Sequence, residues 1–199
     1  MAAIKLDPMK LPGPWAEGFV LERQHTLSSE FLGYDSFGNP QFETKRSELG
    51  ELVFRLKNRN DKNTLDSIAD AAVQYIRGWN PTFDLIVPVP PSWKRADYQP
   101  VVEIATAIAA RLGKPVEMAA VKKVKDTPEL KNVFGYQDRL KLLEGAFKVN
   151  AETVVGKRIL LVDDLYRSGA TARVVAQELL AGGAASMFML AMTKTRTRA

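Results

Sequence analysis

Apolar and polar positions follow two spacings along this chain, and together they predict an α/β fold. Apolar residues three and four positions apart predict helices over residues 47–57, 64–77, 101–112 and 172–179. Continuous apolar runs at 159–162 and 187–192 are typical of strands in a parallel sheet that is covered on both faces. Because a helix separates these two runs, we expect a strand, helix, strand unit in a mainly parallel sheet.

The N-terminal part of the chain has shorter apolar segments between turn residues. Residues 1–14 contain three prolines and predict an irregular lead-in. Strands are predicted at 18–25, 31–34 and 41–45, with a turn at 37–40 between the last two, and Gly78 is expected to stop the helix over 64–77. We expect three parts in one compact unit: the lead-in, residues 15–80, and a core over 81–199.

Composition narrows the class of protein. The chain has 199 residues, of which 46% are hydrophobic, so it can bury a substantial core without disulfides or metal. No apolar stretch approaches the roughly 20 residues that cross a bilayer, and the N-terminus lacks a signal-peptide core. A cytoplasmic location is therefore expected. With no Cys, the chain cannot form a thiolate zinc site, and with His25 as the only histidine it cannot form a metal site made of several histidines.

The formal charge of +5 suits a phosphate-rich partner. Lys194, Arg196 and Arg198 form a basic tail, which is typical of a solvated chain end. The other positive residues are spread along the chain without a nucleic-acid recognition motif, so nucleic acid is not the favoured partner. An anionic small-molecule substrate explains the charge equally well.

The candidate chemistry lies after the run at 159–162. Asp163 and Asp164 follow the predicted strand, where open α/β sheets bind ligands, and their carboxylates can accept hydrogen bonds from a diol. The small residues Ser168, Gly169, Ala170 and Thr171 would let a phosphate approach the backbone at the start of the next helix. This pattern favours a ribose 5-phosphate site, although paired Asp residues alone also occur in structural or solvated loops. A P-loop ATPase is excluded because the chain has no Gly-x-x-x-x-Gly-Lys-Ser/Thr motif.

Residues 159–171 resemble the phosphoribosyl pyrophosphate (PRPP) motif of type I phosphoribosyltransferases, in which two acids precede a small-residue turn ending in Thr. The resemblance implies a doubly wound fold with an N-terminal hood, and a site in which Asp163 and Asp164 hold the ribose while residues 167–171 hold the 5-phosphate. Arg167 departs from the pattern, and its guanidinium cannot act as a proton acceptor at neutral pH.

Other segments resemble the ComF-like branch of that family: residues 84–95 with Gln99, then Thr127, Arg139 and 145–147. The resemblance implies that Arg95 and Arg139 bind pyrophosphate, that residues 121–131 form a mobile lid, and that the N-terminal hairpin is a hood over the acceptor or a structural flap. Two departures are the missing four-cysteine zinc module and Leu130, which aligns with the branch's usual Gln.

The family implies transfer of ribose 5-phosphate from PRPP, bound with Mg²⁺, to a nitrogen acceptor, and release of pyrophosphate. Mg²⁺ would be held mainly by oxygens of the substrate and water, without a metal site of the protein's own. Because Arg167 and Leu130 depart from the pattern, the alternative is a non-catalytic module that senses PRPP or nucleotides, or works in competence. Acceptor identity is left open, and so is a homodimer.

Overall fold

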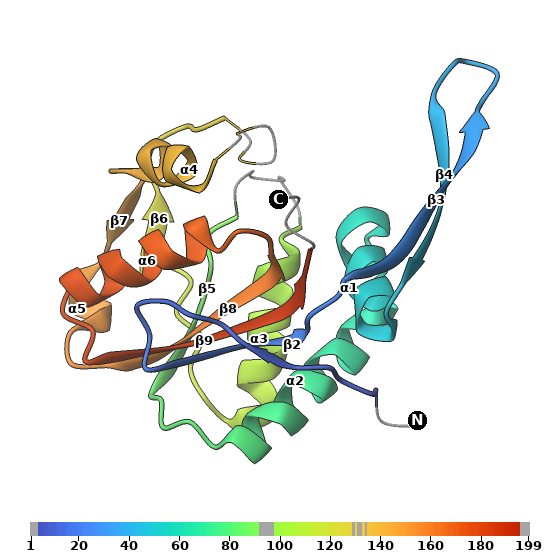
Figure 1. The fold of residues 1–199 in the computed structure, drawn as a ribbon. Helices are drawn as coiled ribbons and strands as arrows, with labels where there is room; N and C mark the ends of the chain where they lie inside the picture. Colours follow the sequence, from blue (N-terminus) through green and yellow to red (C-terminus); the bar gives the residue numbers. More distant parts are fainter. Residues whose placement is uncertain (1–3, 92–97, 129, 131–132, 134, 196–199) are drawn as a thin grey trace.

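A computed structural model describes residues 4–91, 98–128, 130, 133 and 135–195 (Figure 1). Its main sheet has five strands in the order β1-β2-β9-β8-β5. Their bounds are β1 Met9–Lys10, β2 Glu17–Glu22, β9 Ser186–Lys194, β8 Arg158–Tyr166 and β5 Leu85–Pro88. Strands β2, β9, β8 and β5 run parallel, and β1 pairs antiparallel with β2. The expected α/β fold with a mainly parallel sheet is confirmed.

Helices cover both faces of this sheet. One face carries α4 (Tyr136–Leu143), the short α5 (Ala151–Val154) and α6 (Ala170–Ala181), whereas α1 (Glu48–Arg59), α2 (Leu65–Trp79) and α3 (Pro100–Leu112) cover the other. Alternation along β8 separates the two cores, because Ile159 and Leu161 pack toward α6 while Leu160 and Val162 pack in the cluster of α1, α2 and α3. Burial on both faces explains why this strand has a continuous apolar run.

Strand β8 is longer than the apolar run predicted. It extends to Tyr166, because its pairing with β9 continues through Asp163↔Ala191 to Tyr166↔Lys194. The two aspartates therefore lie inside the strand instead of in a loop after it. Residues 1–14 were predicted to be irregular, but Met9–Lys10 forms strand β1.

The helix ends follow side-chain and backbone capping. Ser47 begins α1 by accepting a hydrogen bond from the Gly50 N–H to its Oγ at 3.1 Å. The expected stop at Gly78 is wrong, because α2 continues to Trp79 and ends where Asn80 adopts a left-handed conformation with φ 55°. A single 3-10 turn, Lys62–Thr64, joins α1 to α2.

Two small antiparallel pairs complete the fold. Strands β3 (Thr26–Tyr34) and β4 (Pro40–Arg46) form a hairpin that projects from the body of the molecule (Figure 1). Strands β6 (Val121–Lys123) and β7 (Phe147–Val149) flank α4. Residues 121–131 were expected to form a mobile lid, but residues 121–123 instead pair with β7 as strand β6. Among the described residues, no helix combines the length and apolar character needed to span a bilayer.

Candidate functional site

The candidate site lies at the carboxyl edge of the sheet, where β8 extends beyond its pairing with β5. Strand β5 pairs with β8 as far as Pro88↔Val162, and the Val89 N–H then donates to the Val162 carbonyl at 2.8 Å. Beyond this point β8 continues alongside β9, and carries Asp163 and Asp164 past the paired end of β5. Ligands of open α/β sheets bind at such carboxyl edges. The topology therefore brings the predicted carboxylates to the expected edge.

Asp164 lies on the face of the sheet covered by α1. Its side chain is buried, and Lys57 from α1 donates a hydrogen bond from Nζ to Asp164 Oδ2 at 2.7 Å. The ammonium compensates a carboxylate that would otherwise be costly to bury. A ligand could therefore reach Asp164 only through its remaining oxygen or after Lys57 moves. No sequence motif pointed to this role for Lys57.

Asp163 points to the opposite face, since successive strand residues alternate, and it is half-buried. Burial raises the pKa of its carboxyl above the usual range, and the charge of Asp164 raises it further, while Lys57 opposes both effects. A carboxyl group with a raised pKa is a better proton acceptor when ionised than an ordinary Asp. The two carboxylates thus have different environments: one is paired with a cation and the other is not paired with a described cation at hydrogen-bonding distance.

The single histidine lies beneath the same edge. His25 Nδ1 is 3.0 Å from Thr193 Oγ1, and the Thr193 hydroxyl lies 3.5 Å from the Asp164 carbonyl. Burial lowers the pKa of His25 to about 4, and the positive charges of Arg46 and Lys57 add to this effect. The imidazole is therefore neutral at pH 7 and serves as a packed, hydrogen-bonded support for the ends of β8 and β9.

The turn after β8 leads into α6 through a glycine in a left-handed conformation. Gly169 precedes α6 with φ 75°, a left-handed conformation that favours glycine. A side chain on Gly169 would also overlap the Tyr166 hydroxyl, which packs against the turn. Ala170 and Thr171 then open α6, whose first N–H groups and positive dipole end lie at this turn. The predicted turn residues 167–171 are therefore contiguous at the start of one helix.

A cavity of about 470 Å³ lies beside this turn. Arg139 from α4, Arg167 from the turn and Lys194 from the end of β9 reach it from three elements, with Ser168 next to them. Its other lining residues are Met9, Leu11, Pro12, Gly135, Tyr136 and Tyr166. Three cations around one cavity would attract an anion with several charges. Lys194 had been attributed to a solvated tail; its position directly after an apolar strand was the signal that could have placed it at the carboxyl edge.

The remaining residues of the predicted site are Arg95, Arg139 and Leu130. Arg95, the second residue expected to bind pyrophosphate, lies outside the described residues, as does Lys94. Arg139 donates from Nε to the Val133 carbonyl at 3.0 Å, so part of its guanidinium also holds the segment before α4. Leu130 packs against the core on the α6 side of the sheet. Among the described residues, no group of three or more acidic, His or Cys side chains is arranged to hold a metal ion.

Solved structures share this fold. The glutamine PRPP amidotransferase of B. subtilis, complexed with ADP and GMP, is similar with a TM-score of 0.50 at 17% identity over 79% of this chain. This chain spans 34% of that protein's length. The adenine phosphoribosyltransferase of Trypanosoma brucei, in complex with AMP, pyrophosphate and ribose-5-phosphate, has a TM-score of 0.50 at 12% identity, over 97% of this chain and 87% of that chain.

These similarities show that the chain has the type I phosphoribosyltransferase fold, with a mixed α/β architecture around a mainly parallel sheet. Neither a protein-family model nor a curated protein sequence matches it.

Proposed function

We propose that this protein binds PRPP together with Mg²⁺ and transfers its ribose 5-phosphate to a nitrogen acceptor. The proposal rests on the carboxyl edge of the sheet, where Asp163 and Asp164 lie near the end of β8 and the turn 167–169 then leads into α6. A ribose 5-phosphate has a diol at one end and an anion at the other, so it matches both halves. The ComF-like branch of the family is part of this proposal and rests on the sequence motifs.

The reaction forms a bond between the acceptor nitrogen and C1 of the ribose, and breaks the bond between C1 and the pyrophosphate oxygen. The pyrophosphate leaves with the bonding electrons, and the acceptor nitrogen loses its proton. Positive charge develops on the ribose ring, where the carboxylates of Asp163 and Asp164 would stabilise it. Asp163 is the better candidate for the closest contact, because Asp164 is already paired with Lys57.

Cations of the cavity would hold the phosphate groups. Arg167 and Ser168 lie in the turn that would receive the 5-phosphate, and Arg139 and Lys194 face the same cavity. Arg95 remains proposed for the pyrophosphate on the basis of the sequence alone. Magnesium bound with PRPP would neutralise part of the leaving group's charge, and oxygens of the substrate would supply most of its ligands.

Calorimetry of PRPP with and without Mg²⁺ tests the binding step. We expect binding by the unmodified chain to weaken more than about tenfold in the Asp163→Asn, Asp164→Asn double variant, because a diol loses its charged acceptors. Asp70→Asn is the matched control, since Asp70 is an exposed carboxylate on α2 that pairs with Arg111. Equal PRPP affinity in the unmodified chain, the double variant and the control would refute the site.

The Lys57–Asp164 pair also favours a second candidate, a PRPP- or nucleotide-sensing module without turnover, because one of the two carboxylates is occupied by protein. Release of pyrophosphate in the presence of a panel of nucleobases separates the two functions. Turnover with any base supports the transferase, whereas tight PRPP binding without turnover supports the sensor. A gel shift with DNA at rising salt would test the nucleic-acid version of the sensor.

A further inference from the structure

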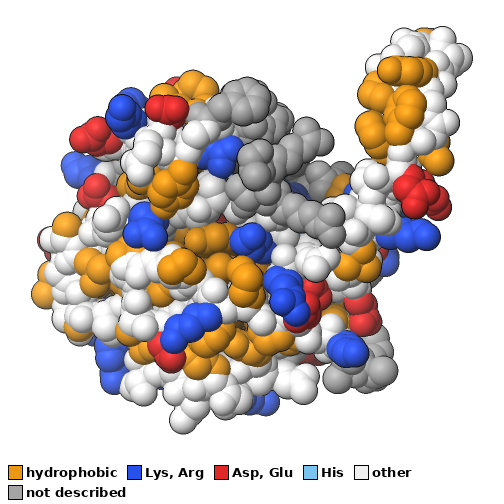
Figure 2. All heavy atoms as spheres, in the orientation of Figure 1, with side chains coloured by type: hydrophobic (Ala, Val, Ile, Leu, Met, Phe, Trp, Pro, Cys, Tyr) orange, Lys and Arg blue, Asp and Glu red, His pale blue; other side chains and the backbone are white. Residues whose placement is uncertain are grey.

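The projecting β3–β4 hairpin exposes an aromatic face to solvent. Phe31 and Phe42 lie directly opposite each other on the two strands with ring centroids 5.5 Å apart, and Tyr34 packs edge-on to Phe31 at 5.2 Å. Phe31 is 53% exposed, Phe42 55% and Tyr34 71%. Figure 2 shows hydrophobic side chains gathered along this hairpin. An exposed apolar surface of this kind marks an interaction site.

The opposite face of the hairpin is acidic. Glu30 and Glu43 alternate with the aromatic residues along their strands and lie directly opposite each other, so their carboxylates repel. Residues 28–44 contain these two glutamates and Asp35 but no Lys or Arg. This segment therefore contributes −3 to the total charge of +5, and the rest of the chain carries +8. Cations supplied by a partner to the acidic face would relieve the repulsion.

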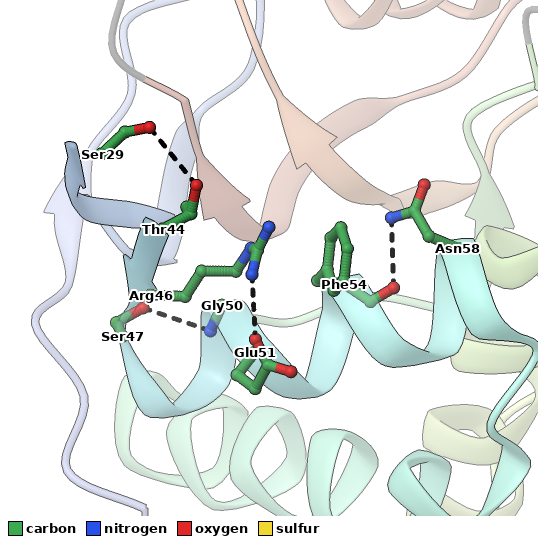
Figure 3. A network of polar contacts seen from close by, with 8 residues as sticks. All are labelled: Ser29, Thr44, Arg46, Ser47, Gly50, Glu51, Phe54 and Asn58. Carbon is green, nitrogen blue, oxygen red and sulfur yellow. Dashed lines mark hydrogen bonds and ion pairs between the residues drawn. The ribbon is translucent and has the colours of Figure 1, made fainter. Parts of the chain in front are cut away.

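Contacts at both ends hold the hairpin in one conformation. At its base, Arg46 donates from Nη1 to Glu51 Oε2 at 3.1 Å, and its guanidinium stacks 3.6 Å from the centroid of the Phe54 ring (Figure 3). At its tip, Asp35 Oδ1 accepts a hydrogen bond from the Asn39 N–H at 2.8 Å. The strands between these contacts extend away from the body of the molecule (Figure 1). Both faces of the hairpin are therefore presented to a partner.

The outer edge of β4 is suited to accept a further strand. Among the described residues, the sheet that contains β4 has two strands, so alternate backbone N–H and C=O groups along each outer edge have no partner in the ladder. The register of β3 shifts at Leu27 and again at Leu32, and such irregularities disrupt an edge. In contrast, the residues of β4 pair with β3 in unbroken order from Pro40 to Arg46. The edge of β4 is therefore the better template for strand addition.

We propose that an extended segment of a partner protein, with apolar and basic residues in alternation, adds to the outer edge of β4 as a third strand. Phe42 and Thr44 face the aromatic side of β4, and Gln41 and Glu43 face the acidic side. Apolar residues of the added strand cover the rings beside Phe42, and its basic residues pair with the carboxylates beside Glu43. Main-chain hydrogen bonds supply affinity in such strand addition, and alternate side chains supply specificity. The hairpin also gains stability, because an isolated pair of strands is marginal in water.

Charge identifies the partner as a basic protein segment. Nucleic acids and anionic membranes carry phosphate groups, which Glu30 and Glu43 repel. The positive body of the chain opposes a basic segment only weakly at this position. Glu43 lies three residues, roughly 10 Å, along β4 from Arg46 at the base, and charges further apart than about 8 Å are largely screened at physiological salt. The nearby carboxylates therefore dominate the attraction.

Titration of the ¹⁵N-labelled chain with synthetic peptides, followed by NMR, tests the proposal. The probe is the capped peptide Thr-Val-Lys-Val-Lys-Val-Thr, whose alternation is the same in both chain directions. One control peptide has the same composition with the lysines adjacent, and a second has Glu in place of Lys. We expect the amide signals of residues 40–44 to shift with the probe. The probe should bind about tenfold more tightly than either control, because only it serves both faces of β4.

Charge reversal in the hairpin gives the sharpest result. A Glu30→Lys, Glu43→Lys double variant should prefer the Glu-containing peptide to the Lys-containing probe. Phe42→Ser should weaken the binding of both peptides, because the apolar residues lose the ring that they cover. Glu152→Lys is the matched control, since Glu152 is an exposed carboxylate on α5 and lies outside the hairpin, and this variant should keep the original preference. The amide spectrum of the main sheet verifies that each variant is folded.

Several outcomes would overturn the proposal. These are the absence of shifts in the hairpin up to millimolar probe, equal affinity for the alternating and rearranged peptides, and a charge-reversed variant that keeps the original preference. Single-stranded DNA and phosphatidylglycerol vesicles are titrated in parallel. Binding of either one to the hairpin would also overturn it, because the partner would then be a phosphate-bearing surface and not a basic strand.

Discussion

Lys57 donates to Asp164 at 2.7 Å and so connects two residues that are 107 positions apart in the chain. The pair fastens the C-terminal half of α1 to the end of β8, at the edge where the candidate site lies. Asp164 is almost fully buried, while the Lys57 side chain is 36% exposed. The same contact therefore stabilises the fold and limits access to one of the two proposed ribose-binding carboxylates.

Replacing Lys57 with Met should destabilise the protein, because Asp164 would remain as a buried charge without this partner. We expect a loss of about 1–3 kcal/mol in the free energy of unfolding, at the low end for broken buried pairs because the ammonium is partly solvated. Urea denaturation measures it. Adding Asp164→Asn should recover most of the loss; if the effects of the two substitutions simply add, the pair contributes no coupling energy.

Asp163→Asn should stabilise the fold while weakening PRPP binding. Burial raises the pKa of Asp163 in the folded protein, so the folded state binds this proton more tightly than the unfolded chain does. The cost of ionising Asp163 in the folded protein therefore grows as the pH rises above the ordinary pKa of Asp. This penalty disappears as the pH falls below the ordinary pKa of Asp, where both states are protonated. The gain in melting temperature should therefore be largest at neutral to alkaline pH and vanish near pH 4. A gain that does not change with pH would contradict this explanation.

His25 should make the protein less stable as the medium becomes acidic. Its pKa is about 4 when folded, against 6.5 when unfolded, so the unfolded chain binds the proton first. The contribution of the buried neutral imidazole to the free energy of unfolding is complete above pH 6.5. It is lost progressively as the pH falls to 4, by up to about 3 kcal/mol. His25→Gln removes the titrating group, so the difference between the two chains should change over this window. A constant difference from pH 7 to pH 4 would exclude His25 as the cause.

Gly169→Ala should cost more than an ordinary glycine substitution in a left-handed conformation. The new methyl group would meet both an unfavourable φ and the Tyr166 hydroxyl, so we expect a loss of about 2–4 kcal/mol in thermal or urea unfolding. Gly113 is a matched control, because its φ is 62° but no atom lies within 4 Å of the added carbon. Gly113→Ala should cost about 1 kcal/mol. Equal losses at the two positions would show that the packing of Tyr166 is unimportant.

Removing a cation from the cavity should weaken the binding of inorganic pyrophosphate. We expect Arg139→Gln and Lys194→Gln each to lower the affinity about fivefold to tenfold, because a charge-assisted hydrogen bond is lost, and to reduce its dependence on salt. Calorimetry at two salt concentrations measures both effects. Lys141→Gln is the control on the same helix as Arg139, outside the cavity lining, and should bind as the unmodified chain does. A similar loss in the control would indicate a general charge effect.

Local patterns were enough to predict the central unit of the fold. The apolar spacing predicted the strand at 159–162, the helix over 172–179 and the strand at 187–192, and β8, α6 and β9 each contain the predicted residues. Strand ends were harder to predict, because the extension of β8 to Tyr166 depends on β9 as a partner. The helix stop predicted at Gly78 was wrong because the left-handed residue that ends α2 is Asn80.

The amino-acid order by itself determined that two carboxylates precede a small-residue turn and a helix, because neighbouring residues and their local conformational preferences suffice for that. Only the tertiary structure decided that Lys57 reaches Asp164, that Arg139, Arg167 and Lys194 surround one cavity, and that the hairpin points outward. These relations join residues from separate elements, and their distances follow from how the helices pack on the sheet, which the pattern along the chain does not specify.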